Sequence, residues 1–549
     1  MANVARTLLR PIAYLAGHQA SVQLRRFLAA HQRTRATQDA LLAELVSRHA
    51  DTAFGRDHGF ARIRSHEDFV AAVPVGNYET LRPYMRRVYD GETTALLPGG
   101  EPVLMFSRSS GTTGEPKHIP VTQRFLNEMR RGWNIFGLRV LRDHPQGWLR
   151  PILQISSPVC EATSPTGLPC GAISGMLAAT QKKIVRRMYV ARPQTDCAND
   201  PAARYYALLR CGIGRDVGIL TTANPSSAIK LIETGQQHAE RLVRDVADGT
   251  FCPPGGEPIP GREFRPDPEL AGRIERGIAD DGELRARHFW NLAFMTLWTG
   301  GTLELYLPRL RELFGELPIR DIGLLASEGR FSLPLEDGTP TGVAEITANF
   351  LEFIPAEAAD SPNPPTLRAH ELAVGGEYFL VITNWAGLWR YNIDDRVRVT
   401  GHLGGSPVFE FLSRGKHTAN ITGEKITEHQ VVEAMGRAAR RDGRRVERFQ
   451  LQGRFARVPY YELRLEEGAG LDAVALAGRM DQELAMLNLE YASKRSSGRL
   501  GPIGAVLLPG GTMQRIEAEM IAARHGRGEQ YKHQYLLTEV LNEQQGSQT

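Results

Sequence analysis

Ser107-Arg108-Ser109-Ser110-Gly111-Thr112-Thr113-Gly114-Glu115-Pro116-Lys117-His118 is the segment of this chain that most clearly predicts its fold and its chemistry. Its two glycines let the backbone approach a ligand closely, so that successive N–H groups can converge on one anion. Lys117 adds a positive charge that can follow phosphate oxygens. Further donors come from the hydroxyls of Ser109, Ser110, Thr112 and Thr113. We therefore expect this loop to hold a polyphosphate.

The flanking residues predict a strand before this loop and a helix after it. The apolar run at residues 102–106 is typical of a short buried strand, and Thr122 can cap a helix that begins near Gln123. The loop differs from the P-loop of NTPases, because two residues rather than four separate its glycines and His118 follows Lys117. An ordinary Ser/Gly/Thr turn is the alternative interpretation.

Length and composition indicate a globular protein of at least two domains. The 549 residues carry a formal net charge of +4, and no block of like charges suggests a nucleic-acid-binding tail. Five cysteines without Cys-x-x-Cys spacing argue against a disulfide framework and a zinc site, and favour a reducing compartment. No apolar run approaches the ~20 residues of a membrane span, so we expect a cytoplasmic protein without one.

The N-terminal residues are basic, because six arginines precede the first acidic residue, Asp39. This charge pattern resembles an organelle presequence. The favoured interpretation is a basic amphipathic helix that packs on the first domain. Its apolar side is expected to carry Leu8, Leu9, Ile12 and Leu15.

Helical patterns alternate with short β-branched runs through the first 400 residues, which predicts a mixed α/β body. Residues 226–242 read as one helix, and residues 409–412 read as a strand that runs into a basic, flexible turn. We therefore expect a large N-terminal domain over residues 1–413, a flexible connection at 414–416 and a small α/β domain over 417–549.

Two further clusters of polar residues follow predicted strands. Ser327 and Glu328 end an apolar run, where a carboxylate can take Mg²⁺ together with substrate phosphates. From these residues alone, a helix N-terminal charge or a solvated turn residue is the favoured interpretation of Glu328. Residues 387–397 alternate aromatic and polar side chains and contain Asp394 and Asp395. These carboxylates could bind ribose hydroxyls, act as acid and base, or simply pair with the arginines at positions 396 and 398.

Three basic residues complete the candidates: Arg414, Lys425 in the segment Ile421-Thr422-Gly423-Glu424-Lys425, and Lys532 near the C-terminus. Each of the two lysines taken alone is expected to be a solvated surface residue. Taken in order, however, these segments resemble the adenylate-forming superfamily, and more closely the auxin-responsive Gretchen Hagen 3 family of acyl-acid amido synthetases. The likeness extends over nearly the whole chain and includes Thr52-Ala53-Phe54-Gly55, Tyr78-Glu79, Thr222-Ala223-Asn224-Pro225-Ser226, Trp298-Thr299-Gly300-Gly301 and Arg390-Tyr391.

The resemblance implies an acyl-adenylate-forming fold and a role for each matching residue. Ser109, Ser110, Gly111, Thr112, Thr113 and Gly114 would hold ATP phosphates together with Lys117. Ser327 would lie against the adenine and Glu328 would bind Mg²⁺, while Asp395, in the stretch that begins with Tyr391, would bind the ribose. Arg414 would lie at the hinge, Lys425 would meet the α-phosphate, and Lys532 would reach the phosphates from the small domain.

The same resemblance implies a ligase that adenylates a carboxylic acid and transfers the acyl group to an amino acid, using ATP and Mg²⁺ and no obligate protein partner. An acyl-CoA ligase and a catalytically silent nucleotide-binding protein are the alternatives. The phosphate loop is one residue shorter than in typical plant members, and Tyr391-Asn392-Ile393-Asp394-Asp395 replaces their Tyr-Arg-x-Gly-Asp. These departures keep the loop glycines, the lysine and the final aspartate, but they weaken any transfer of plant substrates.

Overall fold

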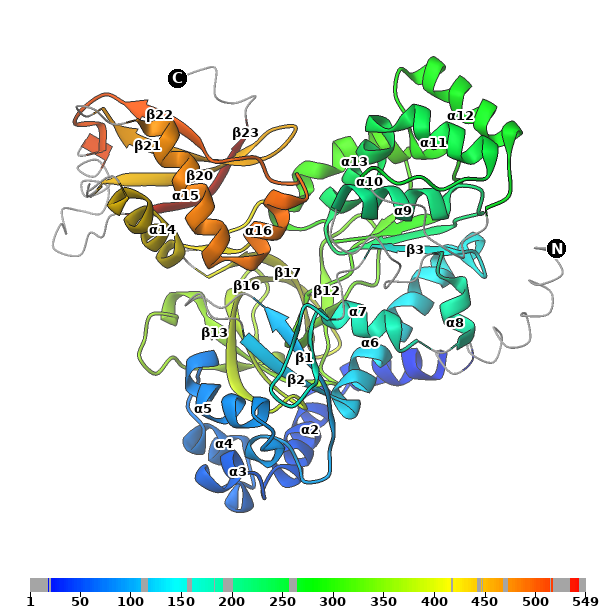
Figure 1. Ribbon diagram of the computed structural model, residues 1–549. Coiled ribbons are helices and arrows are strands. Elements are labelled where there is room, and N and C mark those ends of the chain that lie inside the picture. Colours follow the sequence, from blue (N-terminus) through cyan, green and yellow to red (C-terminus); the bar gives the residue numbers. More distant parts are fainter. Residues whose placement is uncertain are drawn as a thin grey trace. The chain divides into compact units, whose positions relative to one another are not determined.

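The computed structural model describes residues 18, 21–109, 117–155, 160–181, 183–190, 201–255, 264–415, 418–441, 446, 448–467, 472–513, 515–516 and 534–542. The chain folds into two compact units, and the division between them falls between Leu412 and Ser413. Both units combine sheets with helices (Figure 1). The expected mixed α/β fold, with a large N-terminal part and a smaller C-terminal part, is confirmed. The helix expected at Leu8 to Leu15 lies outside the described residues.

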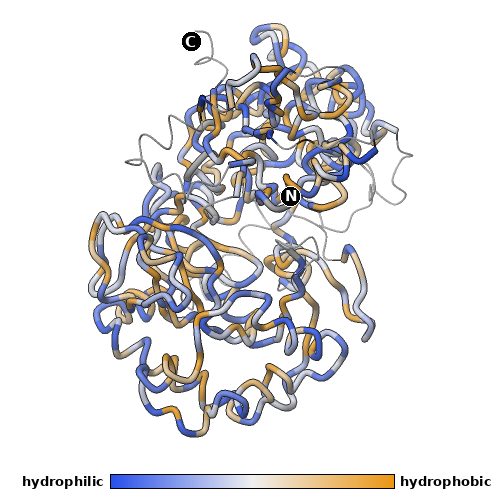
Figure 2. The backbone as a smooth tube through the Cα atoms, turned by 90° about the vertical axis from the view of Figure 1, so that its left-hand side faces the viewer, coloured by the Kyte–Doolittle hydropathy of each residue, from blue (hydrophilic) through white to orange (hydrophobic). Residues whose placement is uncertain are grey.

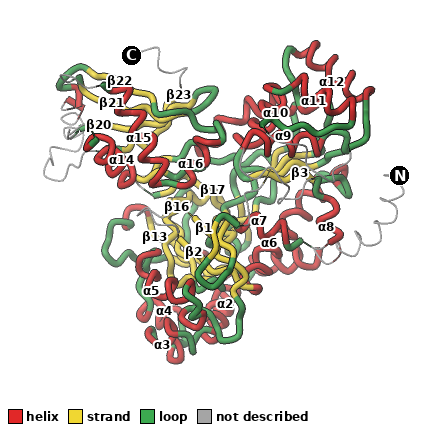
Figure 3. The backbone as a smooth tube through the Cα atoms, viewed as in Figure 1, coloured by secondary structure: helices red, strands yellow, loops and turns green. Residues whose placement is uncertain are grey.

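The main sheet of the large unit has seven strands, with β16 at its centre. Helices of the N-terminal region lie at one end of this sheet (Figure 1), and Figure 3 separates them in red from the yellow strands. In sheet order the strands are β11 (Ser332–Leu333), β12 (Gly342–Ala344), β17 (Ser406–Arg414), β16 (Leu388–Leu403), β15 (Glu377–Asn384), β13 (Asn349–Pro355) and β14 (Leu367–Arg368). The helices are α2 (Thr34–Arg48), α3 (Ala53–Asp57), α4 (His66–Ala72) and α5 (Tyr78–Tyr89).

A second sheet carries the edges of the predicted phosphate loop. The expected strand is present as β1, and the expected helix α6 begins at Gln123, where the Thr122 hydroxyl accepts the N–H of Phe125 at 3.2 Å. In sheet order the strands are β2 (Lys117–Thr122), β1 (Val103–Ser109), β5 (Pro169–Gly171) and β4 (Ala162–Thr163). Helices α6 (Gln123–Asp143), α7 (Ile173–Ala179) and α8 (Lys183–Met188) follow in this part of the chain.

A third, parallel sheet and a short hairpin complete the strands of the large unit. The sheet order is β3 (Ile152–Ile155), β6 (Ile219–Thr222), β7 (Phe294–Thr296) and β8 (Ile319–Arg320), and the hairpin is β9 (Leu325–Ala326) with β10 (Gly329–Arg330). The neighbouring helices are α9 (Pro201–Gly212), α10 (Pro225–Gln237), α11 (Ala239–Asp248), α12 (Pro268–Asp281) and α13 (Leu307–Phe314). The single helix expected over residues 226–242 is wrong, because α10 and α11 meet at His238, which leaves helical geometry.

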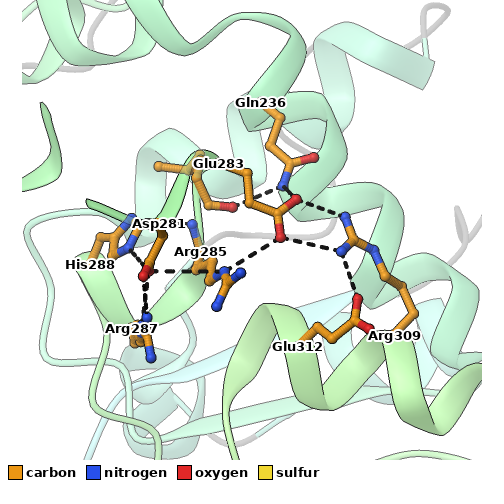
Figure 4. Close-up of polar contacts among 9 residues, drawn as sticks. Gln236, Asp281, Glu283, Arg285, Arg287, His288, Arg309 and Glu312 are labelled. Carbon is orange, nitrogen blue, oxygen red and sulfur yellow. Dashed lines mark hydrogen bonds and ion pairs between the residues drawn. The ribbon is translucent and has the colours of Figure 1, made fainter. Parts of the chain in front are cut away.

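Ion pairs join the helices of this region, and Figure 4 shows how the end of α10 is anchored. The Gln236 amide donates to Glu283 at 3.0 Å, and Glu283 accepts from Arg309 of α13 at 2.9 Å. Asp281, at the end of α12, accepts from Arg287 and from His288. These hydrogen bonds lower the pKa of Asp281 to about 2. The cluster links α10, α12 and α13 through polar and charged side chains, which is typical of a structural network.

The described residues of the small unit form one four-stranded sheet, one short hairpin and three helices. Its apolar core lies between the sheet and helices α14 and α15. In sheet order the strands are β22 (Gly504–Leu508), β21 (Tyr460–Glu466), β20 (Phe449–Phe455) and β23 (Leu536–Asn542). The hairpin is β18 (Thr418–Ala419) with β19 (Ile426–Thr427), and the helices are α14 (Glu428–Arg440), α15 (Ala473–Leu487) and α16 (Leu489–Ser496).

Hydrophilic and apolar residues alternate at short intervals along the chain in both units (Figure 2). Within the described ranges, none of the helices combines the length and the apolar character needed to cross a bilayer.

Aromatic rings surround a buried histidine in the core of the large unit. His49 has no exposed surface, and its ring lies 4.9 Å from that of Trp389 and 5.9 Å from that of Trp385. Its Nδ1 donates to the carbonyl of Leu45 at 2.7 Å. Burial outweighs this bond and lowers the pKa of His49 to about 4 from 6.5, so the imidazole is neutral in the folded protein.

We expect His49 to make the free energy of unfolding rise with pH between about pH 4 and pH 6.5. In this range the unfolded chain binds the proton and the folded protein does not, a difference worth about 3 kcal/mol at the acid end. His49→Phe should flatten this part of the stability profile, measured by urea unfolding from pH 4.5 to 7.5. Equal pH dependence in the two proteins would contradict the assignment.

Candidate functional site

Strands β1 and β2 hold the two ends of the predicted phosphate loop side by side. They pair antiparallel, with Ser109 opposite Lys117 at the end of the ladder. The loop residues Ser110, Gly111, Thr112, Thr113 and Gly114 lie outside the described residues, and so does the side chain of Ser109. The described part of the site therefore begins at Lys117.

Lys117 is buried and its ammonium group meets two tyrosines. Only 8% of the residue is exposed, and its Nζ donates to the hydroxyl of Tyr391 at 3.2 Å. The same Nζ lies 5.7 Å from the ring centroid of Tyr78 and 5.8 Å from that of Tyr391. The structure thus brings together two predicted site residues that are 274 positions apart in the sequence. These contacts hold the positive charge of Lys117 in one position, at the end of the β1–β2 ladder where the loop begins and ends.

Two irregularities in β16 determine how its polar residues are presented. One extra residue lies between Leu388 and Tyr391 relative to β15, and two extra residues lie between Asn392 and Arg396. Each contains a residue with positive φ: Arg390 at 39° and Asp394 at 65°. Such backbone geometry costs free energy in non-glycine residues and is concentrated at functional sites.

A buried ion pair fixes the first irregularity. Arg390 donates to both carboxylate oxygens of Glu352, at 2.9 and 3.0 Å, and both residues are at most 2% exposed. Thr366 accepts a further hydrogen bond from Arg390 at 2.7 Å, and His66 lies 3.2 Å from Glu352. Burial alone would raise the pKa of Glu352, but His66 and Arg390 outweigh it and hold that pKa below its ordinary value. The pair therefore positions the backbone directly before Tyr391.

The second irregularity separates the two neighbouring aspartates. Asp395 is 4% exposed, whereas Asp394 is an exposed residue whose N–H donates to the Asn392 side chain at 2.9 Å. Solvent therefore reaches Asp394 but not Asp395, so the two carboxylates do not form an exposed pair. Arg396 and Arg398 both donate to Glu377 on β15.

Ser327 and Glu328 form the two-residue turn between β9 and β10. Ala326 pairs with Gly329 on either side of this turn. Glu328 is only 2% exposed, and its Oε1 has no hydrogen-bond partner among the described residues. Its carbonyl accepts the Asn384 amide at 2.7 Å, which holds the turn against β15. A buried carboxylate oxygen without a partner fits a cation ligand.

Mg²⁺ at Glu328 would need most of its ligands from the substrate. No group of three or more His, Cys, Asp or Glu side chains arranged to hold a metal occurs in the part of the chain that the structure describes. Mg²⁺ commonly takes one or two carboxylates together with phosphate oxygens and water. The single carboxylate of Glu328 is compatible with that mode.

The small unit presents Lys425 on a tightly bonded loop between β18 and β19. Lys425 has φ 51° and is partly exposed, directly before β19. The loop closes on Glu424, a carboxylate with no exposed surface that accepts the N–H groups of Ile421 and Thr422, each at 2.7 Å. Tyr461 also donates its hydroxyl to Glu424. A charged group that accepts several donors in this way makes a rigid loop.

Asn488 braces the same loop from the start of α16. Its amide donates to the carbonyls of Glu424 at 3.0 Å and Lys425 at 3.3 Å, while its Oδ1 caps α16. The sequence did not predict that Glu424 and Asn488 support the site. The only sequence signal was for Glu424, which lies in a polar segment next to Lys425. The side chain of Arg414 and the whole of Lys532 lie outside the described residues.

Family models match the chain in three consecutive segments. The GH3 family N-terminal domain matches residues 23–319, the central domain residues 343–414, and the C-terminal domain residues 429–540. This chain belongs to the GH3 family. The family expectation from the sequence is therefore confirmed.

Relatives within the GH3 family include several named synthetases. The chain is 27% identical to indole-3-acetic acid-amido synthetase GH3.8 of Oryza sativa subsp. indica, over 88% of this chain and 85% of the relative. It is also 27% identical to jasmonoyl–L-amino acid synthetase JAR6 of Nicotiana attenuata, over 74% and 73% of the two chains. The solved structure of AtGH3.15 acyl acid amido synthetase in complex with 2,4-DB superposes with a TM-score of 0.68 at 20% identity, covering 95% of each chain. This last likeness establishes a shared fold.

Proposed function

We propose that this GH3 protein is an ATP- and Mg²⁺-dependent ligase that adenylates a carboxylic acid and transfers the acyl group to an amino acid. Family membership supports the amide-forming chemistry, because the named relatives are amido synthetases. The observation that carries the proposal in this chain is the buried Lys117 ammonium on Tyr391, beside the loop that the sequence predicts to bind phosphate.

In the proposed first step, the substrate carboxylate attacks the α-phosphorus of ATP and pyrophosphate leaves. We assign the phosphates to Ser109, Ser110, Gly111, Thr112, Thr113, Gly114 and Lys117, and the adenine and ribose to Ser327, Tyr391 and Asp395. Mg²⁺ held by Glu328 would supply charge neutralisation at the phosphates. Catalysis then consists of positioning and electrostatic stabilisation, and no protein nucleophile is needed.

In the proposed second step, the amine attacks the acyl-adenylate carbonyl and AMP leaves. We assign Lys425 to the α-phosphate and Lys532 to the phosphates when the small domain closes. Residues 414–416, with Arg414, serve as the hinge between a domain at 1–413 and one at 417–549. We propose a cytoplasmic enzyme that needs no protein partner.

A matrix of carboxylic acids and amino acids tests this function. Acid-dependent ATP–pyrophosphate exchange reports the first step, and the mass of the product identifies the acceptor. We expect an amide that forms with an amino acid in the absence of coenzyme A. A product that requires coenzyme A would replace the proposal with an acyl-CoA ligase, and exchange at background with every acid would favour a silent nucleotide-binding protein.

A further inference from the structure

Arg330, the last residue of β10, is a buried arginine whose donors are incompletely used. It is 2% exposed, and its Nε and Nη2 have no acceptor among the described residues. Its only described acceptor is the Ser332 carbonyl, which lies 3.5 Å from Nη1. A guanidinium with two buried donors left unsatisfied by the described residues is costly in free energy, so a further acceptor is expected there.

The surroundings hold this guanidinium in one place. It lies 4.3 Å from the ring centroid of Trp133 and 5.3 Å from that of Phe136, both on α6. A Cβ at position 132 would come within 2.7 Å of the Arg330 side chain, so Gly132 of α6 makes room for it. An arginine that is stacked on aromatic rings loses little further freedom when it binds an acceptor.

The carboxylates of Glu345 and Asp321 balance the charge of Arg330 without accepting hydrogen bonds from it. Burial lowers the pKa of Arg330 to about 10, while Glu345 and Asp321 oppose that shift, and the group stays protonated at neutral pH. Asp321 is itself committed to the N–H and hydroxyl of Thr299, at 2.6 and 2.9 Å. Neither carboxylate is within ion-pair distance of Arg330 in the described part of the chain. The charge of Arg330 is therefore balanced nearby, while its Nε and Nη2 donors, like Oε2 of Glu345, have no described hydrogen-bond partner.

Arg330 lies two residues after Glu328, the carboxylate assigned above to Mg²⁺. Two residues of chain span at most about 7 Å, so the backbones at positions 328 and 330 are separated by no more than the length of a small organic acid. Resting on the proposed function, we propose that Arg330 selects acids that carry an uncharged oxygen acceptor, a hydroxyl or a carbonyl, several ångströms from the reacting carboxylate. In this role Arg330 is a specificity residue, and it takes no part in the chemical steps.

The test compares phenylacetate with its 3- and 4-hydroxy derivatives, its 4-acetyl derivative and its 4-carboxy derivative in ATP–pyrophosphate exchange. We expect the hydroxy or acetyl acids to be preferred in kcat/KM over phenylacetate and over the dicarboxylate. Arg330→Met should reduce that preference by about 10²-fold or more, since a site built to hydrogen-bond a substrate group discriminates strongly against its absence. The rate with phenylacetate itself should fall much less, and Arg330→Lys should retain part of the preference.

Arg210→Met is the matched control. Arg210 is 3% exposed, stacks 4.0 Å from the ring centroid of Phe264 and donates to the carbonyl of Asp245 at 2.8 Å. Its substitution should lower stability without a change in the ratio of kcat/KM values. An unchanged ratio in Arg330→Met, or no preference for the oxygenated acids in the wild-type protein, would overturn the assignment; the wild-type panel decides even where a variant fails to fold. Exchange with none of a broad panel of acids would instead count against the proposed function.

Discussion

Lys117→Ala is expected to lower the rate of acid-dependent ATP–pyrophosphate exchange by about 10²–10³-fold, the usual effect of removing one preorganised donor from developing negative charge. Lys117 is suited to this role because it is buried, aimed by Tyr391 and placed at the end of the predicted phosphate loop. The substitution removes the charge but leaves the β1–β2 ladder, whose hydrogen bonds are made by the backbone. Exchange kinetics at saturating ATP and acid give the measurement.

Lys230→Ala provides the control for this prediction. Lys230 is a partly exposed lysine of α10, in the helical region and outside the candidate site. It should leave exchange within about twofold of wild type, as surface substitutions usually do. A normal exchange rate in Lys117→Ala would contradict the assignment of Lys117 to the phosphates. An equal loss in both variants would indicate a general effect of removing a lysine.

Arg390→Met is expected to destabilise the folded protein by about 3–5 kcal/mol, because it leaves the Glu352 carboxylate buried without its cation. Arg390 supplies two hydrogen bonds to Glu352 and a third to the Val73 carbonyl at 2.9 Å. Without Arg390, and with His66 as its remaining neighbour, the Glu352 carboxylate should accept a proton more readily, so the deficit relative to wild type should shrink as pH falls. Urea unfolding at pH 5 and pH 7.5 gives both quantities.

The double variant Arg390→Met/Glu352→Gln separates the ion pair from the packing of the arginine. It should recover much of the loss, since no unpaired charge stays buried. A loss below about 1 kcal/mol in Arg390→Met would contradict the role of the pair. Because Arg390 directly precedes Tyr391, we also expect weaker ATP binding at temperatures where the variant is folded.

Local sequence patterns correctly predicted those strands and helices whose ends are determined by neighbouring residues. The apolar run before the phosphate loop and the Thr122 cap predicted β1 and the start of α6 correctly. The helix over 226–242 was mistaken because the apolar spacing continues through His238, whereas the break there accompanies the bonds of Gln236 to Glu283 and to the carbonyl of Leu284. Those partners lie more than 40 positions away and leave no trace in the local pattern.

The candidate site shows the same division. Lys117, Glu328 and Asp395 could be picked out because glycines, hydroxyls or paired carboxylates surround them in the sequence. The residues that hold the site in place could not, because Glu352 and Asn488 act through the tertiary fold. Arg330 escaped notice for another reason: an arginine is ordinarily solvated, and only its burial on Trp133 makes it unusual.

The two extra residues between Asn392 and Arg396 have a consequence for how this strand can change in length. An insertion of two preserves the alternation of faces, so Val397 and Val399 remain buried while Arg396 and Arg398 reach Glu377. Deletion of one residue between Asn392 and Arg396 would turn the side chains of Arg396 and Arg398 toward the core. Deletion of two residues would restore a regular strand and remove only the irregular segment that carries Asp395. The part of β16 that we assign to the nucleotide can therefore vary in length in steps of two without a change in the faces of the supporting sheet.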